Sequence, residues 1–288
     1  MTITVAGVSI THPGRVLFPA QGLTKGDLAA HFERVAPHML PHVERCPLAL
    51  VRCPRGADNA CFFQKHPQGS EPEGVLGVEV PEGDGRATHF AVEGARGLVG
   101  MAQLGVLEVH VWGSRVDAVE RPDRLVFDLD PDEALPFDAV KDAAKALRRR
   151  CEDDGLHAFV MTTGGKGLHV VAPLEPRASF DDARAYAREV AEALVADAPE
   201  RFVATASKEA RAGKIYIDTL RNGLGATAIA PYSTRARRGA PVATPLRWDE
   251  LSRVEGGDAY DARTIARRLA ALGSDPWEGY ADARRRLP

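Results

Sequence analysis

The chain has 288 residues, of which 44% are hydrophobic, enough to bury a sizeable core in one large domain or two closely associated subdomains. We therefore do not expect a disordered chain. With 37 basic and 40 acidic side chains the formal charge is −3, which argues against non-specific binding of nucleic acid through net charge. No apolar signal segment follows Met1, and no apolar run approaches the roughly 18 residues of a membrane span, so we expect a cytoplasmic protein without membrane contact.

Cysteine content and local charge add two observations. Cys46, Cys53, Cys61 and Cys151 lack the short paired spacing of zinc or redox motifs, and we expect reduced, mostly buried thiols. Eight basic residues but only two acids lie between positions 201 and 240. Such a run is usually a solvated face, so it indicates an anionic partner only together with other evidence.

Four segments show apolar residues at helical spacing. Two of them begin with a capping-box pattern, in which a hydroxyl residue is followed three positions later by an acid: Thr24 with Asp27, and Ser179 with Asp182. Another follows Pro136, a favoured residue at a helix start. The predicted helices cover about 24–39, 136–154, 179–194 and 261–272.

Short β-rich runs lie between these helices. They are Leu48–Arg52, Leu107–Trp112, Leu125–Leu129, Ala158–Thr162, Leu168–Ala172, Lys214–Asp218 and Ala226–Ala230. Several are followed by another strand rather than by a helix, which predicts an α+β fold with an antiparallel or mixed sheet instead of a repeating βαβ array. We expect the Pro- and Gly-containing stretches near 67–74 and 236–245 to be surface loops.

Acidic residues mark two of the predicted strands. Asp128 and Asp130 are two positions apart on an apolar strand, so they point to the same face. Their mutual repulsion would be relieved by a divalent cation. With Asp218 on a neighbouring strand, three carboxylates could hold two Mg²⁺ or Mn²⁺ ions about 3.5–4 Å apart, as in phosphoryl transfer. The alternative is that Asp128 and Asp130 merely end a strand before the turn at Pro131.

A glycine-rich turn runs from Thr163 to Gly167. Its glycines, Gly164, Gly165 and Gly167, would let backbone N–H groups approach an anion, and Lys166 adds a positive charge. The spacing is not that of a P-loop, and no helix follows. A simple hairpin turn is the alternative.

Two further features have equally open interpretations. His110 shares a strand face with Glu108 and Trp112, and it is either a site residue or a structural histidine. Phe62 and Phe63 are adjacent, so on a strand they point in opposite directions and only one of them can lie in the core. The exposed one is a candidate platform for stacking a nucleobase.

Taken in order, these stretches resemble the polymerase domain of bacterial ATP-dependent DNA ligase D, within the archaeo-eukaryotic primase superfamily. The resemblance covers nearly the whole chain. Its motifs are Ile10–Pro19, Thr24–Leu28, Phe62–Lys65, Glu108–Trp112, Phe127–Pro131, Gly164–His169, Lys214–Asn222 and Ala230–Arg237. It implies a single primase-polymerase domain over residues 1–288, with an N-terminal module of about 1–105 packed on a primase-like catalytic core of about 106–288 in which helices flank the sheets.

The resemblance also implies roles for individual residues. Asp128, Asp130 and Asp218 would bind two catalytic metal ions, commonly manganese, and His110 would lie near the nucleotide. Nucleotide binding would involve Thr163, Gly164, Gly165, Lys166, His169, Arg211 and Arg235. DNA binding would involve Phe62, Phe63 and Arg221, together with Arg15 and Lys25, which would hold a 5′-phosphate at a DNA end.

The implied activity is addition of nucleotides, ribonucleotides in preference, to primer 3′-hydroxyls at gaps and double-strand breaks during non-homologous end joining. The implied partners are DNA ends with a 5′-phosphate, ribo- or deoxynucleoside triphosphates, the Ku protein and a DNA ligase, at the nucleoid. Thr163 stands where many members carry serine, and its added methyl group could alter the selection of the sugar. Arg15 stands where some members carry lysine, which keeps the charge but changes the geometry of the hydrogen-bond donors.

Two other functions remain open from the residues. A haloacid-dehalogenase-like phosphatase also has an apolar strand ending in Asp-x-Asp, although Pro131 is unusual for that family. A non-catalytic adaptor for DNA ends is the other alternative, and the intact acids argue against it.

Overall fold

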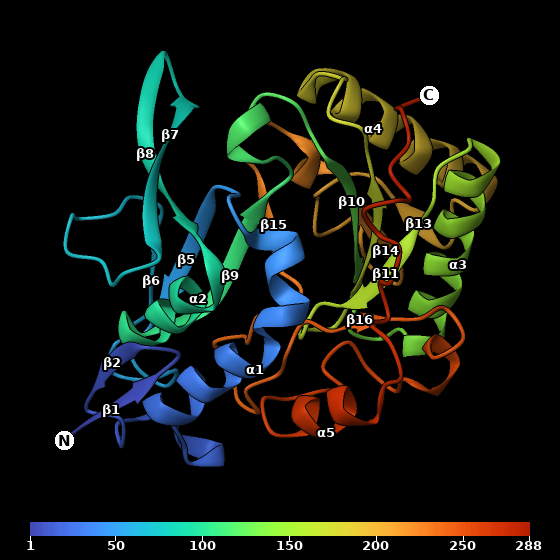
Figure 1. Ribbon diagram of the computed structural model, residues 1–288. Coiled ribbons are helices and arrows are strands. Elements are labelled where there is room, and N and C mark those ends of the chain that lie inside the picture. The colour runs from blue at the N-terminus through green and yellow to red at the C-terminus, as the bar shows by residue number, and fades with distance from the viewer. The chain divides into compact units, whose positions relative to one another are not determined.

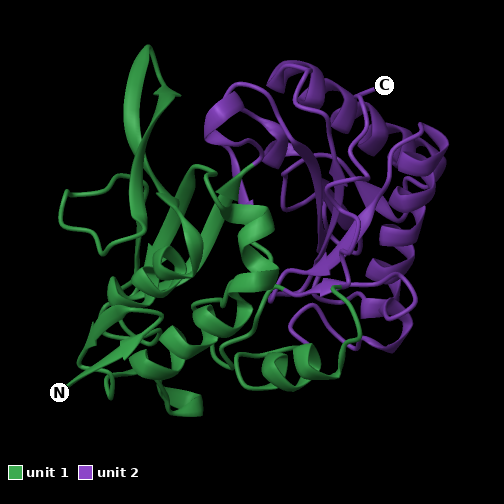
Figure 2. Cartoon of the chain, viewed as in Figure 1, with its two compact units in different colours: residues 1–112, 229–243, 260–275 green, residues 113–228, 244–259, 276–288 purple.

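The computed structural model describes residues 1–288, which divide into two compact units (Figure 2). The first unit comprises Met1–Trp112, Ile229–Ala243 and Tyr260–Asp275, and the second comprises Gly113–Ala228, Thr244–Ala259 and Pro276–Pro288. The C-terminal part of the chain therefore contributes segments to both units.

The first unit is built on an antiparallel sheet (Figure 1). Four of its strands run in the order β9 (Val106–Trp112), β5 (Leu48–Arg52), β8 (Gly85–Val92) and β7 (Val75–Glu82), with β7 at one edge, while β6 (Phe62–Gln64) also pairs with β5. Two small hairpins precede them, β1 (Thr2–Val5) with β2 (Val8–Thr11) and β3 (Val16–Phe18) with β4 (Leu23–Thr24). The edge strand β15 (Thr227–Ile229) spans the boundary between the two units.

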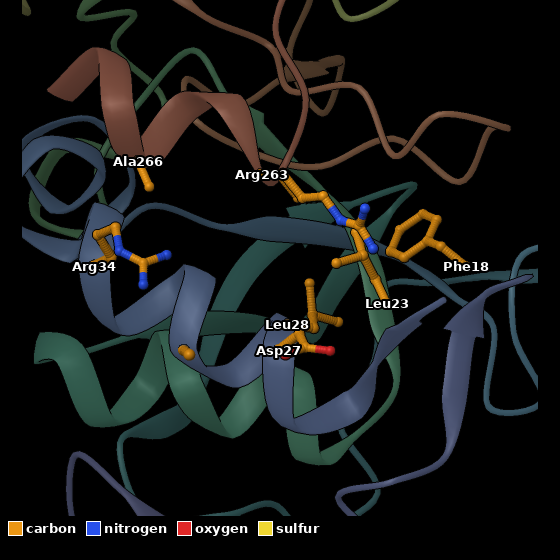
Figure 3. Close-up of a pocket in the computed structure, with 9 residues that line it drawn as sticks. Phe18, Leu23, Asp27, Leu28, Arg34, Arg263 and Ala266 are labelled. Atoms are coloured by element: carbon orange, nitrogen blue, oxygen red, sulfur yellow. The ribbon is translucent and has the colours of Figure 1, made fainter. Parts of the chain in front are cut away.

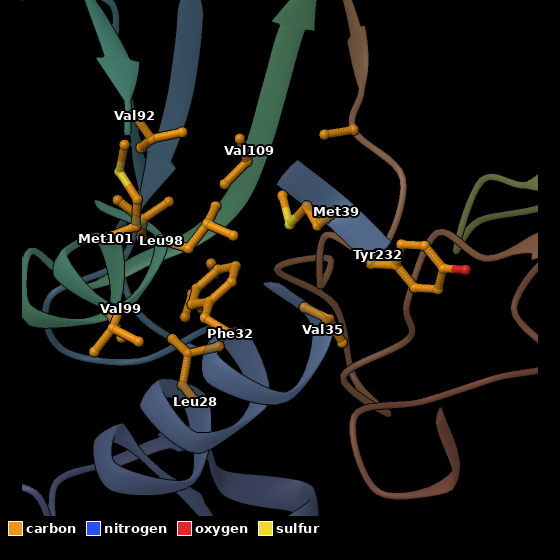
Figure 4. Close-up of a cluster of buried hydrophobic side chains, with 14 of the residues drawn as sticks. Leu28, Phe32, Val35, Met39, Val92, Leu98, Val99, Met101, Val109 and Tyr232 are labelled. Atoms are coloured by element: carbon orange, nitrogen blue, oxygen red, sulfur yellow. The ribbon is translucent and has the colours of Figure 1, made fainter. Parts of the chain in front are cut away.

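Three helices complete this unit: α1 (Lys25–Val43), α2 (Gly94–Gln103) and α5 (Thr264–Ala271). The predicted start of α1 is confirmed, because Thr24 accepts a hydrogen bond from the amide of Asp27, whose carboxylate accepts one from the amide of Thr24. Phe32 and Met39 of α1, Leu98 of α2 and Val109 of β9 belong to one buried cluster (Figure 4).

Helix α2 was not predicted, and its glycines explain why. Gly94, Gly97 and Gly100 disfavour a helix when judged by propensity alone. A Cβ atom on Gly97 would lie 2.3 Å from the carbonyl oxygen of Gly74, so close packing requires glycine there. Helix α5 begins three residues after the predicted Asp261, because the Asp261 carboxylate accepts hydrogen bonds from the amides of Arg263 and Thr264 and so precedes the helix.

The second unit contains a mixed sheet in the order β13 (Phe202–Val203), β14 (Ile215–Asp218), β10 (Arg124–Pro131), β12 (Leu168–Pro173), β11 (Phe159–Thr162) and β16 (Pro245–Leu246). Only β13 and β14 pair in parallel. Helices α3 (Phe137–Asp153) and α4 (Phe180–Asp197) pack on the sheet and on each other. The chain also forms the short 3₁₀ helices η1 (Pro19–Gln21), η2 (Val116–Ala118), η3 (Leu220–Asn222) and η4 (Leu251–Arg253).

The predicted α+β class with antiparallel and mixed sheets is confirmed. The helix starts at Pro136 and at the Ser179 capping box are also confirmed. The expected surface loop at 236–245 is wrong in its second half, where residues 240–244 are buried because Ala240 and Val242 belong to the hydrophobic cluster of the first unit. None of the helices has the length and apolar character needed to span a lipid bilayer.

The expectation that all four cysteines are reduced is wrong for one pair. Cys53 and Cys61 form a disulfide, with their Cα atoms 4.4 Å apart, whereas Cys46 and Cys151 are free and buried. The bridge joins the end of β5 to the start of β6, a pairing that sequence spacing did not indicate.

This disulfide leads to a simple prediction. Titration of the denatured, unreduced protein with a thiol reagent should detect two thiols per chain, those of Cys46 and Cys151. After reduction the same titration should detect four, the number in the sequence. Four thiols without reduction would show that Cys53 and Cys61 are not bridged in the isolated protein.

Candidate functional site

The second unit carries an acidic face on β10. Leu125, Phe127 and Leu129 are fully buried on one side of this strand, and Asp128 and Asp130 alternate with them on the other. In the antiparallel pairing of β10 with β14, Asp128 lies directly opposite Asp218. Three carboxylates from two neighbouring strands thus lie on the same part of the sheet.

Basic side chains approach these carboxylates. The Nη2 atom of Arg221 is 3.1 Å from Asp128 Oδ2 and 3.3 Å from Asp218 Oδ2. Arg211 stacks its guanidinium on the ring of Tyr216, 3.6 Å from the centroid, and lies 3.8 Å from Asp130. Arg211 and Arg221 therefore partly neutralise the acidic face.

His169 is the neighbour of Asp128 on the opposite side, on β12. The two residues are directly paired in the β10–β12 ladder, and His169 Nε2 lies 3.4 Å from Asp128 Oδ1. Burial would raise the pKa of Asp128, but His169 and Arg221 beside it hold that pKa below its ordinary value. Asp128 is therefore ionised at neutral pH.

The acidic face fits a divalent cation. Burial raises the pKa of Asp130, and the negative charges of Asp128 and Asp218 raise it further despite Arg211. The repulsion from the two neighbouring carboxylates is the part of this effect that a bound cation would relieve. Carboxylate oxygens are the ligands that Mg²⁺ and Mn²⁺ prefer, so the three acids fit such an ion in number and in chemistry.

The glycine-rich turn connects β11 to β12, close in sequence to His169. The amides of Thr163 and Gly164 donate to the carbonyl oxygens of Gly167 and Gly257, and the amide of Gly165 donates to Thr163 Oγ1. These amides are therefore occupied within the protein, and the expected backbone cradle for an anion is not formed by them.

Lys166 supplies the charge of this turn. Its exposed Nζ forms an ion pair with Glu133. Both residues line a cavity of about 500 Å³, together with Gly165, Asp258 and Phe137. The turn thus borders an open space.

Gly167 is required where the turn enters β12. A Cβ atom at this position would lie 2.0 Å from the carbonyl oxygen of Leu129 on β10. We expect Gly167→Ala to displace β10 and lower the free energy of unfolding by about 1–3 kcal/mol, measured by urea denaturation. Gly273→Ala is the matched control, because no atom lies within 4 Å of a Cβ there. Equal stability of the two variants would contradict the close approach.

The first unit contains a separate charged group around Glu108. Glu108 accepts a hydrogen bond from the amide of Ala236, and its carboxylate lies 2.8 Å from His110 Nε2 and 3.2 Å from Arg235 Nε. Burial raises the pKa of Glu108, but the hydrogen bond with His110 and the charge of Arg235 hold it at about 2. The sequence pattern placed Glu108 on the face of His110 without giving it a role, yet it orients two predicted site residues.

Phe62 and Phe63 are both exposed, at 47% and 53%, so neither of them lies in the core. They lie on β6, which pairs with the last three residues of β5, so that Phe63 lies opposite Val51 and Phe62 opposite Arg52. The guanidinium carbon of Arg52 lies 5.4 Å from the centroid of the Phe62 ring. The ring of Phe63 contacts that of His110 edge to face, with 6.1 Å between the centroids. Both rings remain accessible to a stacking partner.

Arg15 and Lys25 come together at the start of α1. The amide of Lys25 donates to the carbonyl oxygen of Arg15, and the Lys25 ammonium donates to Gln103 Oε1 at 2.7 Å. Burial lowers the pKa of Lys25 to about 8, and the charge of Arg15 contributes to the shift. A pair of cations at a helix N-terminus is suited to an anion.

A second cavity, of about 360 Å³, lies beside α1 and α5 (Figure 3). Asp27, Leu28 and Arg34 line it from α1, and Arg263 and Ala266 line it from the α5 region. None of the predicted site residues belongs to it.

The sequence of the chain is similar to proteins of known description. A model of the family described as "LigD, primase-polymerase domain" matches residues 24–277. The multifunctional non-homologous end joining protein LigD of Pseudomonas aeruginosa is 38% identical over 283 residues, which cover 98% of this chain and 34% of that protein. The corresponding Mycobacterium tuberculosis protein is 37% identical over 252 residues, which cover 85% of this chain and 33% of that protein.

The fold is similar to that of a solved structure. The polymerase domain of Mycobacterium tuberculosis ligase D, in complex with DNA, superposes with a TM-score of 0.87 at 33% sequence identity, covering 95% of this chain and 98% of that one. The chain thus spans about a third of the P. aeruginosa protein, but nearly the whole of a solved polymerase domain. It belongs to the LigD primase-polymerase domain family, whose members are primase-like nucleotidyltransferases.

Proposed function

We propose that this chain is a DNA-end-repair polymerase that adds nucleotides, with a preference for ribonucleotides, to primer 3′-hydroxyls at gaps and double-strand breaks. The observation that carries the proposal is the β10–β14 register, which brings Asp218 opposite Asp128 on the acidic face. The role in non-homologous end joining is supported by the descriptions of the similar LigD proteins.

Asp128, Asp130 and Asp218 would hold two Mn²⁺ or Mg²⁺ ions. Such ions, when bound, would supply positive charge that makes a primer 3′-hydroxyl more acidic and neutralises triphosphate oxygens. The reaction itself would join the 3′-oxygen to the α-phosphate and release pyrophosphate. Arg221 already neutralises Asp128 and Asp218 from one side, at 3.1 and 3.3 Å. Its guanidinium would exchange these contacts for a DNA or nucleotide phosphate as the ions bind.

His169 and Lys166 would contact the nucleotide. His169 lies beside Asp128, so it can reach an anionic group held at the acidic face. The Lys166 side chain, and not the occupied amides of Thr163, Gly164 and Gly165, would contribute the positive charge of the turn to the triphosphate.

The remaining roles are proposals that rest on the family resemblance. Arg211, Arg235 and His110 would assist nucleotide binding, Phe62 and Phe63 would stack on bases, and Arg15 with Lys25 would bind a 5′-phosphate. We also propose that the two units act as a single primase-polymerase domain over residues 1–288, and that Ku and a DNA ligase are its partners at DNA ends in the nucleoid.

Primer extension by the unaltered chain on a gapped duplex tests the proposal. The assay compares Mn²⁺ with Mg²⁺, ribonucleotides with deoxynucleotides, and gaps with or without a 5′-phosphate. We expect templated addition that requires a divalent ion and is fastest with ribonucleotides at phosphorylated gaps. The proposal would be overturned if no nucleotide were incorporated under any condition and the chain instead released phosphate from a simple phosphoester. It would also be overturned if the chain incorporated no nucleotide and only paired DNA ends.

A further inference from the structure

A second group of metal-ligand side chains lies in the first unit, apart from the acidic face of the second. His66 follows β6, Glu82 ends β7 and His89 lies within β8, three strands that Figure 1 shows in one part of the fold. The Nε2 atoms of His66 and His89 each lie 3.6 Å from Glu82 Oε2. One ligand atom from each residue lies within 4.8 Å of the other two.

His89 has no hydrogen-bond partner for either ring nitrogen, although its side chain is only 1% exposed. Buried imidazoles are normally hydrogen-bonded, because burial of an unpaired polar group is unfavourable. A neutral imidazole has one unprotonated nitrogen, which can bind a metal ion. A metal ion bound to a ring nitrogen of His89 would supply the missing partner.

His66 is oriented in the way that metal-binding histidines commonly are. Its Nδ1 lies 3.0 Å from the carbonyl oxygen of Thr88 and must donate a proton to it. The Nε2 atom, which faces Glu82, is then the unprotonated nitrogen in the neutral ring. Lys65 pairs with the other carboxylate oxygen of Glu82, Oε1, at 3.5 Å and leaves Oε2 to the two histidines.

We propose that His66, Glu82 and His89 form a binding site for a zinc-like divalent transition-metal ion. Two imidazole nitrogens and one carboxylate oxygen suit Zn²⁺, with water as the fourth ligand, whereas Mg²⁺ prefers oxygen ligands alone. Tetrahedral bonds of about 2.0–2.1 Å place ligand atoms about 3.4 Å apart, so the 3.6 Å separations need only a small adjustment. The ion ties the segment after β6 to the β7–β8 hairpin and so restrains the strand that carries Phe62 and Phe63.

Metal titration of the full chain tests the site. The protein is freed of metal with a chelator and then titrated with Zn²⁺ by calorimetry in excess Mg²⁺, which occupies oxygen-only sites such as the acidic face. We expect one equivalent of Zn²⁺ to bind, and Co²⁺ in its place to show the visible absorption of a four-coordinate ion. At a free Zn²⁺ concentration about 100-fold above Kd, Tm should rise by roughly 5 °C.

Variants identify the ligands. His66→Ala, at a half-exposed position, and the isosteric Glu82→Gln should each weaken Zn²⁺ binding by at least about 100-fold, more than the loss of an outer-shell partner does. The exposed His157→Ala should bind as the unaltered chain does. Asp128→Asn should still bind one equivalent of Zn²⁺. This result would show that the zinc site is distinct from the acidic face.

Two results would overturn the proposal. One is that no Zn²⁺ binds to the chain when Mg²⁺ is in excess. In that case His66, Glu82, His89 and Lys65 form an ion-pair network and nothing more. The other is unchanged Zn²⁺ affinity in both His66→Ala and Glu82→Gln, which would place a bound ion elsewhere in the chain.

Discussion

Replacing Asp128 with asparagine should reduce primer extension by at least about 100-fold with either Mn²⁺ or Mg²⁺. Loss of an outer-shell partner of a metal costs about 10- to 100-fold, and loss of a ligand should cost more. Asparagine keeps the shape of the side chain but removes the charge that pairs with Arg221 and His169. Single-nucleotide addition to a labelled primer at saturating triphosphate measures the effect.

The control for this variant is Asp142→Asn, which removes an exposed carboxylate on α3 that pairs only with Lys145. Circular dichroism and thermal unfolding of both variants show whether a loss of activity reflects a loss of fold. If folded Asp128→Asn extends primers as fast as the unaltered chain in Mn²⁺, the acidic face is not the catalytic centre.

Replacing Lys25 with methionine should lower the affinity for a 5′-phosphorylated gap by roughly 10- to 100-fold, the value of one charge-assisted hydrogen bond. Methionine preserves most of the buried stem of the side chain and removes only the charge. Affinity for the same gap without a phosphate should change little. Fluorescence anisotropy with the two DNA substrates measures the difference, and Lys145→Met on the exposed face of α3 is the control.

The preference for the phosphate should also depend on pH. The pKa of Lys25 is about 8 in the free protein, so the side chain is charged below pH 8 and loses its charge as pH rises. Phosphate binding favours the charged form and raises the pKa, so affinity is full below about pH 8 and falls as pH rises above it. Lys25→Arg stays charged throughout and should flatten this dependence. An equal preference for the phosphate at pH 7 and pH 9 in the unaltered chain would contradict the role of Lys25.

Features set by short-range chemistry could be predicted well. Both capping boxes lie where the spacing of a hydroxyl residue and an acid indicated them, because the hydrogen bonds join residues three positions apart. Helix α2 and the β7–β8 hairpin were missed. The need for glycine at Gly97 arises from the carbonyl of Gly74, which is distant in sequence.

In the candidate site, too, some features follow from the local sequence and others depend on residues far apart in the chain. Alternation on β10 indicated that Asp128 and Asp130 share a face, and this follows from strand geometry alone. The association of Glu108 with Arg235 joins residues from β9 and a late loop, and no local pattern reports it. The cluster of His66, Glu82 and His89 likewise depends on the pairing of β7 with β8 and on the path of the chain after β6.

The sequence by itself determined the α+β class, the helix starts at Thr24 and Ser179, and the acidic face of β10, because each depends on neighbouring residues and on strand or helix periodicity. Only the tertiary structure decided that Asp218 lies opposite Asp128, and that residues 229–243 and 260–275 join the first unit. Strand register and the return of distant segments depend on side chains that meet only when the cores are packed, so local patterns do not specify them.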